Sequence, residues 1–274
     1  MESILEFEFI RNAILAAILA SIACGIIGSY VVVKRLVSIS GSIAHSAFGG
    51  IGLGYFLGVD PMVAVIPFSL VCAVGIGWIS KKTKLPADTA IGIFWALGMA
   101  IGAVLISLTP GYAPDLFSYL FGNILTVPRT DLMIMGILDL IIVSFVVLFY
   151  KQFLVVAFDE EYAEAIGLKV NFLYFLLLCL IALTVVVLIR IVGTILVIAL
   201  LTIPAATAKQ YIKNFHQLIV LSILIGTIFT LFGLWLSCVL DLASGATVIL
   251  FSSVVFILTA LIQRFRRRIA VFRT

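Results

Sequence analysis

A series of long apolar stretches, separated by short polar segments, constrains this chain more than any other sequence feature. About 20 apolar residues are needed for a helix to cross the hydrocarbon core of a bilayer. Nine stretches approach or reach this length, each bounded by charged residues, glycine or proline: 12–33, 42–58, 62–80, 88–108, 131–150, 170–189, 192–208, 217–238 and 245–263. The pattern predicts an all-α, polytopic transmembrane bundle with about eight or nine spans.

The composition excludes a soluble protein. Of the 274 residues, 64% are hydrophobic and only 11% are charged, whereas soluble domains contain about 25% charged residues. A chain this apolar cannot bury its surface in one globular core, so lipid must be the solvent for most of it. No polar segment is long enough for a separate soluble domain. We therefore expect one transmembrane domain over residues 1–274.

The distribution of basic residues predicts the orientation. If the N-terminus is outside, 14 of the 17 lysines and arginines fall on the cytoplasmic side. Only Arg11, Arg129 and Arg190 fall on the other side. Cytoplasmic loops carry such an excess of positive charge, so we expect the N-terminus outside and the C-terminus inside. The basic tail at 264–268 is then a lipid-headgroup anchor, and no nucleic-acid partner is expected.

Small residues recur at helical spacing in two of the predicted spans. Gly50, Gly54 and Gly58 follow one another at intervals of four, and Gly98 and Gly102 do the same in a later span. Helix faces made of small residues allow the backbones of neighbouring helices to approach closely in lipid. We interpret them as helix-packing surfaces, of which a dimer contact is one form.

The stretch 192–208 is short and contains Pro204. Proline removes a backbone donor and interrupts a helix. We therefore expect a broken or partly inserted helix there, in which Pro204 contributes to packing. For the segment 109–130, where proline and glycine alternate with aromatic residues, we expect short helices at the outer membrane interface.

Two ionisable side chains fall inside predicted spans, where polar groups are costly and usually functional. His45 lies a turn or two inside 42–58, and Asp139 lies near the middle of 131–150. An imidazole in an apolar helix is either a metal ligand or a structural hydrogen-bonding group. Asp139 is either a functional carboxylate or a buried one bonded within the bundle. Together they would offer one nitrogen and one oxygen to a passing divalent cation.

The polar segment between Lys151 and Lys169 predicts a short helix outside the bilayer at about 159–168. Its start has a capping side chain followed by acidic residues, and a glycine follows its end. The residues that define it are Asp159, Glu160, Glu161, Ala163 and Gly167. The segment is either a solvated loop helix or a lever that contacts another protein.

No catalytic motif accompanies these features. The chain contains no Gly-Lys pair, so it lacks the phosphate-binding loop of nucleotide hydrolases. The motifs of zinc peptidases and serine hydrolases are also missing from the sequence. We therefore expect a transport subunit rather than an enzyme, without a tightly bound cofactor.

Four stretches of the sequence resemble those of a known protein family. They are 11–13 with 24–35, the segment 40–50 around His45, 159–168, and 192–208. In this order they resemble permeases of ATP-binding-cassette importers for zinc, manganese and iron, whose architecture is similar to that of cobalamin and siderophore permeases. The likeness extends over nearly the whole chain.

The resemblance implies a location in a bacterial cell membrane, together with partners and roles. It implies a second permease copy, two cytoplasmic ATPase subunits that hydrolyse the ATP, and an external metal-binding protein that docks near 109–130 and Asp241. The segment 159–168 would be the coupling helix that contacts the ATPase. His45 matches the channel histidine of the family, with zinc, manganese or iron as cargo and zinc the first expectation.

One position departs from the family pattern. The family usually has aspartate four residues before the histidine, where this chain has Gly41. Asp139, or no fixed ligand, would then take its place. A siderophore or cobalamin permease remains an alternative, as does a secondary carrier in which Asp139 relays protons.

Overall fold

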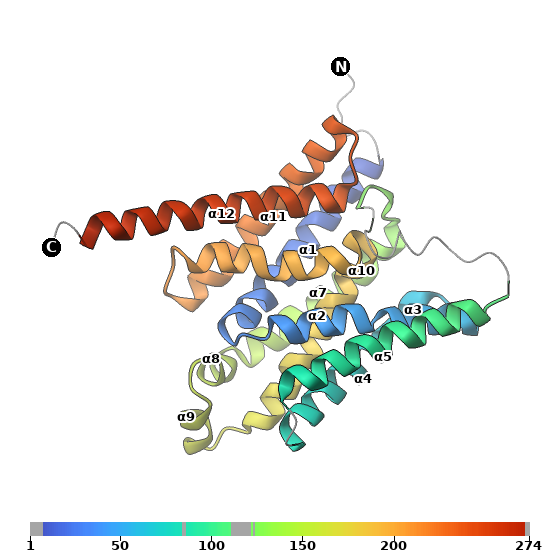
Figure 1. Ribbon diagram of the computed structural model, residues 1–274, viewed down its shortest axis with the longest axis horizontal. Helices are drawn as coiled ribbons and strands as arrows, with labels where there is room; N and C mark the ends of the chain where they lie inside the picture. Colours follow the sequence, from blue (N-terminus) through green and yellow to red (C-terminus); the bar gives the residue numbers. More distant parts are fainter. Residues whose placement is uncertain (1–7, 84–85, 111–121, 123, 272–274) are drawn as a thin grey trace.

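The computed structural model describes residues 8–83, 86–110, 122 and 124–271, and these contain helices but no strand (Figure 1). Most are long apolar helices, and the shorter ones fall at breaks or turns of the chain. The elements are α1 (Glu8–Val33), α2 (Val37–Ser46), α3 (Phe48–Leu57), α4 (Pro61–Lys82), α5 (Ala87–Leu108), η2 (Ile124–Thr126), α7 (Arg129–Leu148), α8 (Tyr150–Phe158), α9 (Glu160–Ala165), α10 (Val170–Lys209), α11 (Phe215–Leu240) and α12 (Ser244–Val271).

Among the described residues, seven helices are long and apolar enough to cross a membrane. They lie in α1, α4, α5, α7, the first part of α10, α11 and α12. The two other predicted spans take a different form. Residues 42–58 fall in α2 and α3, which are ten residues each, and 192–208 corresponds to the shorter apolar helix Leu196–Lys209. The all-α fold is confirmed, while the number of spans and their orientation stay predictions.

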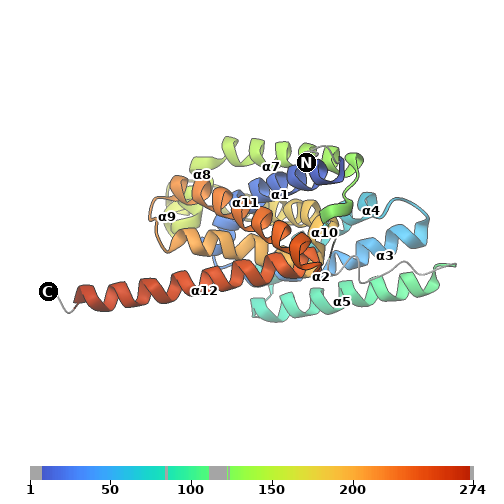
Figure 2. The ribbon, with the colours of Figure 1, turned by 90° about the horizontal axis from the view of Figure 1, so that it is seen from above.

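Two helices form the centre of the bundle. In the most apolar windows of α1 and of the first half of α10, 72% of the residues are buried, against 22% in α5 and α12. Helix α1 packs against α10 and α11, and α3 packs against α4 and α5. Seen from above, α7 lies along one side, α5 and α12 along the other, with α1 and α10 between them (Figure 2).

Helix α10 is two helices joined at a glycine. Gly193 has φ 68° and ψ 169°, a backbone conformation that only glycine adopts without strain. The chain turns sharply there and runs back across the bundle (Figure 1). The expected break near 192–208 therefore lies at Gly193. Pro204 remains inside a helix, where its ring approaches Gly226 of α11.

The glycines of the second predicted span have two roles. A Cβ on Gly50 would lie 2.7 Å from the Cα of Val65, and one on Gly54 would lie 2.5 Å from the Cα of Pro61. Both glycines therefore allow α3 to pack directly on the backbone of α4. Gly58 instead ends α3 in the left-handed conformation, with φ 68°.

The segment expected to form interfacial helices lies mostly outside the described residues, at 111–121 and 123. Within its described part, η2 forms one short 3-10 turn at Ile124–Thr126. Asn12 of α1 donates a hydrogen bond to the carbonyl oxygen of Val127 at 3.3 Å. This bond fixes the start of α7 against the N-terminal end of α1.

Candidate functional site

His45 lies in the last turn of α2, half-buried beside α5. Its ring stacks on the indole of Trp95, with ring centroids 4.2 Å apart and an angle of 11° between the planes. The Nδ1 atom is buried and has no hydrogen-bond partner. Trp95 is 37% exposed and lies, by helical spacing, on the same face of α5 as Gly98 and Gly102. The imidazole therefore lies at the edge of the helical bundle, and its Nδ1 atom makes no hydrogen bond.

The backbone around His45 is fixed by contacts with α5. The Ser42 hydroxyl donates to the carbonyl oxygen of Ile91 at 2.7 Å. A Cβ on Gly98 would lie 2.4 Å from the Cα of Ser46, so the two backbones are in direct contact. These contacts on both sides of His45 set the position of its ring relative to Trp95.

Gly41, one turn before His45, faces the second half of α10. A Cβ at this position would lie 3.1 Å from Cδ1 of Ile198, at the end of a flexible side chain. A side chain here is therefore tight but could be accommodated by a small shift of Ile198. No carboxylate is supplied by this turn of α2.

Asp139 lies in a different part of the bundle. It is 5% exposed on α7, which packs mainly against α1, α8 and α10, whereas α2 packs mainly against α4, α5 and α10. Neither carboxylate oxygen has a hydrogen-bond partner. The structure therefore places Asp139 in the interior and His45 at the edge, and does not show the two as one site.

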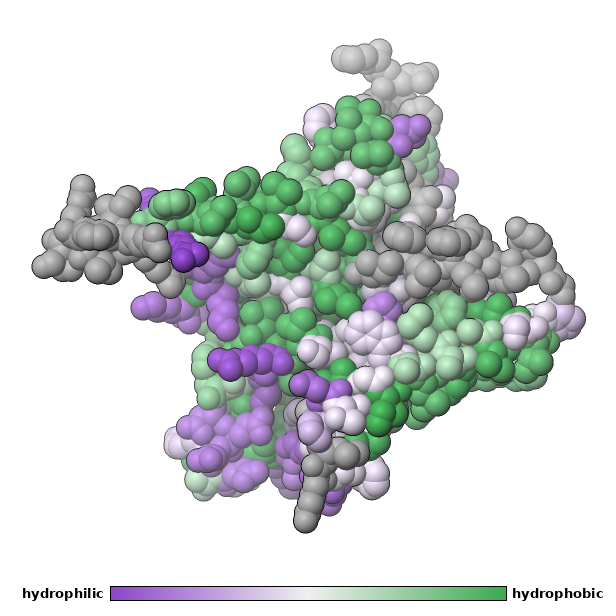
Figure 3. Space-filling view, viewed as in Figure 1, coloured by the Kyte–Doolittle hydropathy of each residue, from purple (hydrophilic) through white to green (hydrophobic). Residues whose placement is uncertain are grey.

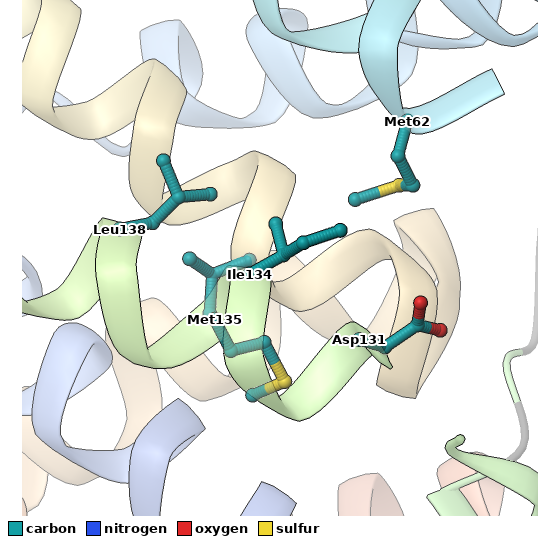
Figure 4. Close-up of a pocket in the computed structure, with 6 residues that line it drawn as sticks. Met62, Asp131, Ile134, Met135 and Leu138 are labelled. Carbon is teal, nitrogen blue, oxygen red and sulfur yellow. The ribbon is translucent and has the colours of Figure 1, made fainter. Parts of the chain in front are cut away.

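No group of three or more His, Cys, Asp or Glu side chains that could hold a metal ion occurs within the described parts of the chain. A small internal cavity lies between α4, α7 and α10, lined by Met62, Asp131, Ile134, Met135, Leu138 and Val187 (Figure 4). Asp131 lies at one edge of this otherwise apolar space. The cavity does not amount to a tight cation site.

The predicted coupling segment is a short helix at the polar end of the molecule. Helix α9 covers Glu160–Ala165, slightly less than the expected 159–168. Asp159 caps it by accepting a hydrogen bond from the amide of Tyr162 at 2.9 Å. Gly167 follows with φ 82°, and its amide donates to the carbonyl oxygen of Glu164 at 2.9 Å. The sequence signals at both ends of the helix thus have the structural roles expected of them.

One side of this segment is buried and the other is open. Ala163 is fully buried, whereas Phe158, Tyr162 and Ile166 are 64%, 57% and 51% exposed. Figure 3 shows hydrophilic residues gathered around α8 and α9, while much of the rest of this face is hydrophobic. Large exposed apolar side chains within a hydrophilic surface are typical of a protein-binding site.

Sequence reasoning missed Trp95 and Lys34. Trp95 stacks on His45 from a position 50 residues away in the sequence, and Lys34 pairs with Glu160 of α9 at 2.6 Å. Each contact depends on how helices from distant parts of the chain are placed. The sequence places Lys34 among the basic residues and in the stretch 24–35 but indicates no partner for it, and Trp95 is one aromatic residue among many.

These features define a class of protein: a multi-pass helical permease whose polar end carries a short helix suited to contact another protein. Comparison with known proteins gives the family. The chain belongs to the ABC 3 transport family, whose profile matches residues 6–263. It is therefore a permease subunit of a bacterial ABC transporter rather than an enzyme, and the resemblance to metal importers is confirmed.

Similar proteins cover almost the whole chain. An uncharacterised membrane protein of Synechocystis sp. is 48% identical over 264 residues, which is 96% of this chain and 94% of that protein. The manganese transport system membrane protein MntC of Listeria monocytogenes is 35% identical, covering 95% and 93%. The solved structure of PsaBC from Streptococcus pneumoniae in complex with Fab superposes with a TM-score of 0.85 at 34% identity, covering 94% and 93%.

Proposed function

We propose that this chain is the permease of an importer that carries zinc, and that the metal passes His45. The observation that carries the proposal is the half-buried imidazole with an unpaired Nδ1, fixed against Trp95 at the edge of the chain. A cation must bind strongly enough to enter a pathway and weakly enough to leave it. One imidazole, without a surrounding ligand cage, fits this requirement.

The donor set favours zinc over manganese. Imidazole suits zinc, whereas manganese prefers carboxylate, carbonyl and water oxygens. Gly41 stands where the resemblance implies an aspartate, so the turn that precedes His45 offers no carboxylate. Iron remains compatible with imidazole, and the manganese named for MntC belongs to a relative whose similarity does not fix the ligands here.

A second copy of the permease would complete the pathway. The face of α5 that points away from Trp95 and His45 is apolar and open, with Ile93, Leu97 and Val104 49%, 50% and 56% exposed. A copy packed against α5 in a homodimer would bury these side chains, and the metal would cross between the two permeases. We further propose that an external metal-binding protein delivers the cation, and that the cytoplasmic ATPase contacts α9.

The proposal is tested in the complete complex, reconstituted in vesicles with its ATPase and binding protein. Zinc uptake that depends on ATP should fall by at least about tenfold in His45→Ala, a loss typical of removing a group that holds a metal. His216→Ala is the matched control, because this exposed histidine lies at the start of α11. Equal uptake by both variants and the wild type would contradict the assignment of His45.

The choice of metal has a separate test. Gly41→Asp restores a carboxylate one turn from His45, with only the end of Ile198 to displace. The ratio of manganese to zinc uptake should rise in this variant, because the added oxygen donor suits manganese better. An unchanged ratio would mean that this turn does not determine which metal is carried.

A further inference from the structure

Lys34 joins three elements at the C-terminal end of α1. Its Nζ atom donates to Oε1 of Glu160 at 2.6 Å and to the carbonyl oxygen of Val156 at 2.8 Å. The lysine side chain is only 7% exposed, while that of Glu160 is 47% exposed. The ammonium group therefore ties the end of α1 to the last turn of α8 and to the first turn of α9.

The same lysine begins the turn between α1 and α2. Its amide donates to the carbonyl oxygen of Tyr30 at 2.9 Å, and that of Leu36 donates to Val31 at 2.8 Å. Between them, Arg35 has a φ of 59°, in the left-handed region that non-glycine residues seldom occupy. Such a conformation persists only where the surroundings hold it. Helix α2, which carries His45, starts directly after this turn.

Aromatic rings join the end of α1 to helix α8 and to the start of α11. The ring of Tyr30 lies 5.7 Å from that of Phe153 on α8 and 4.7 Å from that of Phe215 on α11. Phe158, just before α9, lies 6.1 Å from Phe215. The Lys34 side chain beside this cluster is itself only 7% exposed. A buried ammonium group that loses its partners is costly, so the joined elements should move together.

We propose that Lys34 is a positioning residue that transmits the movement of the coupling helix to the α1–α2 turn, and thereby to His45. The proposal rests on the proposed function, in which the ATPase contacts α9. The chain itself offers a second route, since α9 leads directly into α10. The Lys34 junction differs because it reaches the helix that carries the metal-pathway histidine without passing through α10.

The test measures metal uptake and ATP hydrolysis together in the complete complex reconstituted in vesicles. In Lys34→Met, ATP hydrolysis should persist while the number of metal ions imported per ATP falls by at least about fivefold, the lower range of coupling between two sites. Lys34→Arg keeps a cationic donor and should retain most of the ratio. Lys151→Met, an exposed lysine on neighbouring α8, is the matched control and should leave the ratio unchanged.

A double variant identifies the partner. If Lys34 acts through Glu160, then Lys34→Met with Glu160→Ala should lose no more coupling than Lys34→Met alone, because residues of one pair are not additive. Losses that multiply would overturn the proposed pair. If Lys34→Met does not fold, Glu160→Ala replaces it in the test, because the Glu160 side chain is half-exposed and its loss should be tolerated. The number of metal ions imported per ATP must then fall in Glu160→Ala. An unchanged number would also overturn the proposed pair.

The outcomes separate this proposal from the one on which it rests. A wild-type complex without ATP-dependent metal uptake would overturn the proposed function, and the role of Lys34 with it. Normal uptake per ATP in Lys34→Met would overturn only the role of Lys34. A parallel fall in hydrolysis and uptake, with their ratio constant, would show that the lysine is merely structural.

Discussion

The two regions to which we assign a function, the site end around His45 and the coupling end around α9, are held together by different means. Around His45, helices α2, α3 and α5 meet backbone to backbone: a Cβ on Gly52 would lie 2.5 Å from the carbonyl oxygen of Gly102. Around the coupling helix, the contacts are the Lys34–Glu160 ion pair and the aromatic rings near Tyr30. Backbone contacts leave no side chain to readjust, whereas an ion pair and rings can separate and form again. The site end is thus suited to hold a geometry and the coupling end to transmit a movement.

The largest effect is expected where the site end is forced apart. In Gly98→Ala, the new Cβ would lie 2.4 Å from Cα and 2.5 Å from Cβ of Ser46. Overpacking typically lowers the free energy of unfolding by about 1–3 kcal/mol. We expect a loss at or above the upper end of this range, because the backbone of α2 cannot move away as a side chain could. Thermal unfolding of the purified permease in detergent measures the loss.

A matched control distinguishes overpacking from a general effect of alanine. Gly136→Ala on α7 has nothing within 4 Å of the added Cβ. Alanine favours a helix over glycine by roughly 0.5–1 kcal/mol, so the control should unfold at the same or a higher temperature. If Gly98→Ala were as stable as this control, the close approach of α2 and α5 would be wrong.

The next effect concerns the link between the two ends. Gly193 joins the half of α10 that follows the coupling helix to the half that covers Gly41 through Ile198. At φ 68° and ψ 169°, a Cβ introduces backbone strain of about 1–3 kcal/mol. We expect Gly193→Ala to lower the unfolding temperature relative to Gly136→Ala. No difference between the two would indicate that the turn of α10 does not need a glycine.

The sequence predicts the region around α9 better than the region around His45. Helix α9 is predicted closely, because its signals are local: Asp159 caps the start and Gly167 follows the end. The break between α2 and α3 at Ala47 is not predicted, because the apolar stretch 42–58 contains no proline to mark it. Instead, α2 begins earlier than expected because the turn at Lys34 and Arg35 ends α1.

Long-range contacts could not be read from the sequence. Lys34 and Glu160 are 126 residues apart, and the pairing of His45 with Trp95 depends on how closely α5 approaches α2. Charge and helical periodicity show that such residues exist inside or beside a span. They do not show which span lies opposite, because lipid-facing and protein-facing surfaces are equally apolar.

A smaller effect should separate the ring stack from the fold around it. Trp95→Leu keeps an apolar side chain on α5 and removes the stack on His45. An aromatic pair contributes about 0.5–1.5 kcal/mol, so we expect zinc uptake in the reconstituted complex to fall by roughly threefold to tenfold with little loss of stability. Trp95→Phe keeps a ring and should retain most uptake. Equal losses in both variants would argue against stacking as the cause.

The smallest effect is expected at Asp139, although the sequence raised it beside His45 as a pathway residue. Asp139→Asn keeps the shape of a 5% exposed side chain whose two oxygens have no hydrogen-bond partner. Because α7 packs mainly on α1, α8 and α10 rather than on α2 or α5, we expect zinc uptake to stay within about twofold, since the exchange keeps the side-chain shape and removes no hydrogen bond. A loss as large as that of His45→Ala, at unchanged stability, would instead make Asp139 a second cation ligand. The pathway would then pass through the interior of the bundle rather than along its edge.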